Sequence, residues 1–86
     1  MIDEQTAKHQ CPCCGYRTLD ERASYEICKV CFWEDDGQGD ADADIVMGGP
    51  NKDLSLIAAR ANFKRVGASD ERWLAYVRAP TAEEAR

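Results

Sequence analysis

Residues 11–31, which read CPCCGYRTLDERASYEICKVC, decide the fold. Two Cys-x-x-Cys pairs lie at the ends of this stretch, and 13 residues separate them. Such pairs form tight turns that each offer two thiolates to one ion, and this spacing is close to that of four-cysteine zinc sites. The sequence therefore predicts a single metal site whose ligands are Cys11, Cys14, Cys28 and Cys31.

The metal predicted for this site is one structural Zn²⁺. A tetrahedral set of four sulfur atoms also suits iron, which remains the minor alternative. Because the protein supplies all four ligands, no position is left for water or substrate, and we expect no catalysis at the metal. Two nearby residues stay outside the expected ligand set: Cys13 as a spare thiol or alternative ligand, and His9 as a surface residue.

The size and composition of the chain agree with a metal-stabilised domain. With 86 residues it forms one domain, whose core alone gives thin stability. Its five cysteines are an odd number, which argues against a complete disulfide framework. The first residues lack the basic start and apolar run of a signal peptide, and no membrane-length apolar run follows. We therefore expect a cytoplasmic protein that does not enter a membrane.

The expected fold class is a small α+β metal-stabilised domain. A zinc-ribbon-like β-hairpin with two zinc knuckles is expected first, followed by one or two short helices. Residues 1–10 are predicted to be a polar lead-in, and residues 11–33 the zinc ribbon. Within the ribbon, residues 16–19 and 24–27 contain Tyr, Thr and Ile and are predicted to be the two strands that join the cysteine pairs.

Residues 54–80 are expected to be the helical part, packed on the ribbon. Apolar residues recur at helical spacing up to Val66, and Gly67 follows where a helix ends, so we predict a helix over 54–66. Asn51, Asp53 and Ser55 are candidate caps for its first turn. A second helix is expected to begin near Ser69 and to end at Pro80, and residues 81–86 are expected to form a flexible tail.

Residues 34–53 are predicted to be an acidic loop and turn, with 45–47 as a short strand. They carry seven acidic residues and one lysine. Such charge beside aromatic residues favours a protein-interaction module with a basic protein partner. The candidate partner-binding residues are Phe32, Trp33, Glu34, Asp35, Asp36, Asp40 and Asp42. The alternative is a solubilising loop, with Phe32 and Trp33 packed under the ribbon.

Other function classes find less support in the sequence. The chain has no Ser-His-Asp set, phosphate loop or HExxH motif and only one histidine, which argues against an enzyme. The acidic residues from Asp40 begin like a calcium loop, but Ile45 stands where that loop needs glycine. A thiol-redox role would rest on Cys13 alone. A nucleic-acid-associated regulator would use Arg60, Lys64, Arg65, Arg72 and Arg78, and the net charge of −5 argues against it.

Two longer stretches, CPCCGYRTLDERASYEICKVCFWEDDG from residue 11 and GGPNKDLSLIAARANFKRVGASDERW from residue 48, resemble the bacterial family called the cysteine-rich CPCC domain. The resemblance implies a zinc-ribbon-like fold with the metal on the same four cysteines, and it implies little about activity. The helix that contains Ala61-Asn62-Phe63 is also similar to a helix of many small immunity proteins in bacterial toxin systems. This similarity implies toxin neutralisation as one role, while the partner's identity and the oligomeric state stay open.

Overall fold

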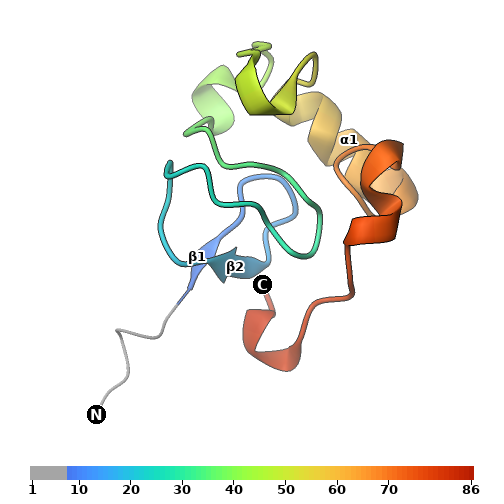
Figure 1. Cartoon of the computed structure of the whole chain (residues 1–86). Helices are drawn as coiled ribbons and strands as arrows, with labels where there is room; N and C mark the ends of the chain where they lie inside the picture. Colours follow the sequence, from blue (N-terminus) through green and yellow to red (C-terminus); the bar gives the residue numbers. More distant parts are fainter. Residues whose placement is uncertain (1–7) are drawn as a thin grey trace.

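Two short hairpins, one α-helix and several 3-10 segments make up residues 8–86, which are the residues that this computed structural model describes (Figure 1). The greater part of the lead-in predicted over residues 1–10 lies outside the described residues. The elements are β1 (His9–Gln10), β2 (Arg17–Leu19), η2 (Asp40–Asp42), η3 (Gly49–Asn51), α1 (Leu56–Val66), η4 (Glu71–Tyr76) and η5 (Ala82–Glu84). Within residues 8–86 no helix has the length and apolar character needed to span a membrane.

The strand pairing differs from the predicted hairpin. β2 pairs with β1, which precedes it, in an antiparallel arrangement that places His9 opposite Leu19. Residues 24–27 form no strand with β2; instead, a single antiparallel bridge joins Ile27 to Glu34 beyond the second cysteine pair. The prediction that residues 16–19 and 24–27 pair with each other is therefore wrong, although the two-strand antiparallel hairpin itself is present.

The cysteine turns explain this pairing, because each of them brings its own flanking residues together. The Cys11 N–H donates to the carbonyl of Tyr16 at 2.8 Å, and the Cys28 N–H donates to the carbonyl of Trp33 at 2.9 Å. These bonds commit the backbone on both sides of each pair to a local reversal. The ribbon thus consists of two short hairpins side by side, with a cysteine pair in each turn.

The core is small and lies around the cysteines. Leu19, Val30, Trp33 and Leu56 are its largest fully buried apolar side chains. They come from β2, from the second hairpin and from the first turn of α1, so the core joins the ribbon to the helix. The burial of Trp33 agrees with the expectation that this residue packs under the ribbon.

Helix α1 begins and ends at the signals in the sequence. The Ser55 hydroxyl caps its first turn and accepts the Ala58 N–H at 3.1 Å. Gly67 ends it with φ +91°, and its N–H donates to the Phe63 carbonyl. The predicted range of 54–66 is therefore two residues too long at its start, because the residue before the first helical one is the cap.

The second helical segment is shorter than predicted. It is the 3-10 helix η4, and the carboxylate of Asp70 caps its start by accepting the Arg72 N–H. Its aromatic side chains stack on the second cysteine turn: the Phe32 ring centroid lies 5.0 Å from that of Trp73 and 5.5 Å from that of Tyr76. This stack, and not a continuing helix, fixes residues 71–76 against the ribbon.

The acidic stretch is held by buried polar side chains, contrary to the expectation of a solvated loop. Asp35 has no exposed surface, and its carboxylate accepts hydrogen bonds from Arg22 Nε at 2.8 Å and from the Ala23 and Gly37 amides. Gln38 is also buried. Residues 45–47 are not the predicted strand, because within residues 8–86 no segment pairs with them.

Residues 81–86, expected to be a flexible tail, instead return to the first hairpin. η5 lies near β2, and the chain end marked C is beside that strand in Figure 1. Arg78 forms an ion pair with Glu84 that lowers the pKa of Glu84 to about 2. Arg86 donates to the Cys14 carbonyl at 2.9 Å and lies over the Tyr16 ring. The contacts of Arg86 are with residues far away in the sequence, and the composition of the segment alone did not reveal them.

Because the Asp35 carboxylate is buried and fully hydrogen-bonded, its replacement should destabilise the protein. We expect Asp35→Asn to lower the free energy of unfolding by about 2–4 kcal/mol, since Arg22 and two backbone amides lose a charged acceptor. The control is Asp40→Asn, which makes the same chemical change at a side chain that is 91% exposed. Its cost should be below about 1 kcal/mol. Urea denaturation of the metal-loaded variants measures both, and equal midpoints would contradict a structural role for Asp35.

Candidate metal centre

The first cysteine turn is closed by backbone bonds around a left-handed residue. The Gly15 N–H donates to the Cys11 carbonyl at 2.8 Å, and Gly15 has φ +83°. A Cβ at Gly15 would also come within 3.1 Å of the Arg86 side chain. Glycine therefore suits this position for two reasons, its positive φ and this close approach. The Cys13 N–H points at Cys11 Sγ, with 3.4 Å between nitrogen and sulfur.

The second turn repeats this geometry with a different residue at the left-handed position. The Phe32 N–H donates to the Cys28 carbonyl at 2.8 Å, and the Val30 N–H donates to Cys28 Sγ at 3.4 Å. Phe32 stands where the first turn has glycine, and its φ is +70°. A left-handed conformation costs a non-glycine residue roughly 1–2 kcal/mol. The stack of Phe32 on Trp73 and Tyr76 offsets part of this cost.

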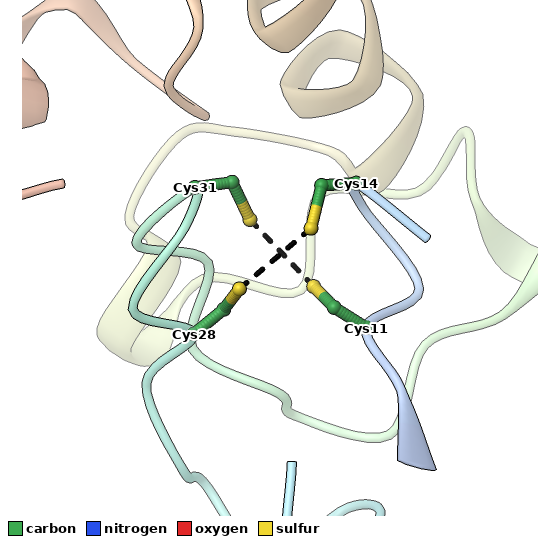
Figure 2. A group of neighbouring side chains, drawn as sticks. All are labelled: Cys11, Cys14, Cys28 and Cys31. Carbon is green, nitrogen blue, oxygen red and sulfur yellow. Dashed lines mark hydrogen bonds between the residues drawn. The ribbon is translucent and has the colours of Figure 1, made fainter. Parts of the chain in front are cut away.

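The two turns face each other and bring four sulfur atoms together (Figure 2). Cys11 Sγ lies 3.6 Å from Cys31 Sγ, and Cys14 Sγ lies 3.7 Å from Cys28 Sγ. All four sulfur atoms lie within 4.8 Å of one another. A tetrahedron whose corners are about 2.3 Å from a central zinc ion has edges of about 3.8 Å. The cluster therefore has the size and the donor set of a tetrahedral metal site.

The cluster is buried and has a further hydrogen-bond donor. Each of the four cysteines is at most 2% exposed, so no face of the site is open to solvent. Thr18 Oγ1 in β2 donates to Cys28 Sγ at 3.0 Å. A hydroxyl and amides aimed at sulfur stabilise thiolates, as second-shell donors do in metal sites. Sequence analysis did not find Thr18, because only the unexpected pairing of β2 brings it to the cluster.

The proximity of the sulfur atoms changes how they ionise. The Cys14 thiol, and after it Cys28, raises the pKa of Cys11, while the Cys11 thiol raises the pKa of Cys31. The pKa of Cys28 is lowered by hydrogen bonding from Cys11 and then from Cys14. The cluster by itself thus favours one thiolate, and four thiolates side by side need a cation among them.

Two arginines lie at the first turn, on its outer side. Arg60 from α1 donates through Nε to the Pro12 carbonyl at 2.8 Å, and Arg86 donates to the Cys14 carbonyl. Four thiolates around a dication carry a net charge of −2, which nearby guanidinium groups partly balance. These residues are 48 and 72 positions away from their acceptors, so no local pattern identifies them.

The other residues that the sequence analysis singled out are not part of the four-sulfur cluster. Cys13 is 8% exposed and stands outside the four-sulfur group, and His9 is on the surface in β1. Of the predicted partner-binding residues, Trp33 and Asp35 are fully buried and cannot meet a partner. Phe32, Glu34, Asp36 and Asp42 are half-buried, and Asp40 is exposed. The predicted partner surface is therefore reduced to these five half-buried or exposed residues.

Comparison with known proteins identifies a family but no individual related protein. A family model described as cysteine-rich CPCC matches residues 9–84. No curated protein and no solved structure matches the chain. The matched residues include both cysteine turns, α1 and η4.

The geometry predicts that Cys28 is a metal ligand and that Cys13 is not. Cys28→Ser should abolish stoichiometric metal binding and unfold the ribbon, because it removes a corner of the cluster and the acceptor of two donors. Cys13→Ser should keep one metal ion per chain and the fold. Metal analysis of the purified variants, together with circular dichroism before and after chelation, measures both effects. Full metal content in the Cys28 variant, or its loss in the Cys13 variant, would show that the ligand set is different.

Proposed function

The chain belongs to the cysteine-rich CPCC family, and on this premise we propose that it is a small zinc-binding protein that acts as a protein-interaction module. The buried cluster of four sulfur atoms with tetrahedral spacing is the observation that carries the zinc assignment. Four protein ligands close the coordination sphere, which is typical of a structural zinc. The metal then stabilises the fold, and function lies on the surface.

The proposal of an interaction role is supported by the charges around the ribbon. The exposed acidic residues of segment 34–53 include Asp40, Asp44 and Asp53, and their charge would steer a basic partner toward this face. Asp36 and Glu34 contribute as half-buried groups at its edge. A toxin-neutralising immunity protein is one specific form of this role, and relief of toxicity by co-expression with the product of a neighbouring gene would test it.

The same contacts speak against a nucleic-acid reader. A basic surface that binds phosphates needs cations that are free to pair with them. Within residues 8–86, the four arginines predicted for that role are engaged with carboxylates, as is Arg22, whereas no ion pair engages the predicted Lys64. The pairs are Arg22 with Asp35, Arg60 with Asp40, Arg65 with Glu71, Arg72 with Asp70, and Arg78 with Glu84.

The identity of the metal has a direct optical test. We expect the purified protein to contain one zinc per chain and to be colourless, because Zn²⁺ has a filled d shell. Iron bound by four thiolates absorbs visible light, so elemental analysis combined with an absorption spectrum separates the two metals. A coloured preparation with stoichiometric iron would overturn the zinc assignment.

The acidic face is tested by removing charge at residues that do not support the fold. The double variant Asp44→Asn and Asp53→Asn should recover less of the natural partner from lysate of the source cells, and the difference should shrink as salt rises. The control is Glu21→Gln with Glu83→Gln, which removes the same charge from exposed positions outside the segment. Zinc content should stay unchanged in both. Equal recovery by the two variants would reduce the acidic segment to a solubilising loop.

A further inference from the structure

We propose that Ile45, Val46, Met47 and Ile57 form a docking surface for a cationic amphipathic segment of a partner protein. The four residues are called the apolar patch below. This inference rests on the proposed interaction function and adds apolar residues to the acidic segment 34–53 and to the first turn of α1. None of the four was among the residues predicted to bind a partner.

The exposure of the apolar patch is unusual for such residues. Ile45 is 50% exposed, Val46 54%, and Met47 and Ile57 55% each. Single exposed apolar residues are ordinary on a protein surface, whereas a contiguous group marks an interaction site. Ile45, Val46 and Met47 are consecutive in the chain. Their apolar side chains are exposed to water and do not pack into the small core.

The patch is held in place by buried groups. The Gln38 side chain, which is 1% exposed, donates through Nε2 to the Ile45 carbonyl at 2.7 Å and to the Asp42 carbonyl at 2.8 Å. The Ile57 N–H donates to the Ala43 carbonyl at 2.8 Å, which fixes the first turn of α1 against the loop. A surface that is ordered before binding loses less conformational entropy when a partner docks.

The charges around the patch select the chemistry of the partner. Asp44 precedes Ile45 directly and is exposed, and the Asp53 side chain is 92% exposed. Within residues 8–86 no ion pair engages Asp44, whereas Asp40 is paired with Arg60, and the Asp53 carboxylate lies 4.0 Å from the Arg72 guanidinium in an exposed pair that leaves most of its charge in solvent. Asp44 and Asp53, which flank residues 45–47 in the sequence, are called the acidic rim. Exposed carboxylates beside apolar side chains complement a segment with an aliphatic face and flanking lysine or arginine residues.

The same rim disfavours the other occupants of an apolar surface. A second copy of this chain would bring like charges together, since the segment carries seven acidic residues and one lysine. Anionic lipid headgroups and nucleic-acid phosphates would be repelled in the same way. A basic amphipathic helix lays its apolar face into such a site and pairs its charges at the edges, and it is the occupant that fits both features.

The experiment uses the full, metal-loaded chain and a defined probe. The probe is a synthetic helical peptide with leucines at helical spacing and lysines on the other positions, and its control is a peptide of the same composition in scrambled order. We expect amide chemical-shift changes at residues 44–47 and 57 with the amphipathic peptide only. Val46→Ser with Met47→Ser should weaken its binding at least about tenfold, a change of roughly 1.4 kcal/mol.

A matched variant controls for the loss of apolar surface in general. Tyr25 and Leu74 are 57% and 46% exposed and lie outside the patch, so their replacement by serine should leave peptide affinity unchanged. Equal binding of the scrambled peptide, or unchanged binding by the Val46 and Met47 variant, would overturn the patch as a docking site. A dimer in sedimentation equilibrium that this variant dissolves would overturn the choice of occupant.

The outcomes also separate this inference from the proposed function. If Asp44→Asn with Asp53→Asn weakens peptide binding while the serine variant does not, the acidic face binds basic partners and the apolar patch has no part in it. If neither pair of substitutions affects the peptide and natural-partner recovery is also unchanged, both proposals fail. Weakening by both pairs is the result expected here.

Discussion

The close approach of four buried cysteine sulfur atoms is the constraint on which the rest of the structure depends. Cys28 is stabilised as a thiolate by its neighbours, while the pKa values of Cys11 and Cys31 are raised. A dication among the four sulfur atoms would reverse this balance and stabilise all four as thiolates. Apparent binding free energies of structural zinc reach about 10–16 kcal/mol, which is comparable to the whole stability of a small domain. An ion bound at this cluster would add such a contribution to a core that is small by itself.

The parts of the fold that depend on neighbouring residues could be predicted from the sequence. The Cys-x-x-Cys spacing indicated the four-sulfur group, Gly67 indicated the end of α1, and Ser55 was one of three candidate caps for its start. The family resemblance is confirmed over most of the chain. In each case the physical cause lies within a few residues: a turn that needs glycine, a hydroxyl that caps an amide, or two thiols that can reach one ion.

The parts that depend on distant residues could not be predicted. Strands at 16–19 and 24–27 satisfy local strand patterns, but each pairs across its own cysteine turn. Asp35 looked like one carboxylate of a repulsive run, and only the position of Arg22 and two loop amides makes it a buried structural group. The contact of Arg86 with Cys14 spans 72 residues. Composition describes the average environment of such a segment, not the partner of an individual side chain.

The left-handed Phe32 has a consequence for how the metal state becomes visible. Phe32 follows the last cysteine of the cluster directly, and its ring stacks on the half-buried indole of Trp73. Release of an ion from the four cysteines would free the backbone of this turn and remove support from the ring stack. The solvent exposure of an indole determines the colour and intensity of its fluorescence. An ion bound by the four cysteines would therefore have an intrinsic optical reporter in this indole, and its exchange could be followed without an added dye.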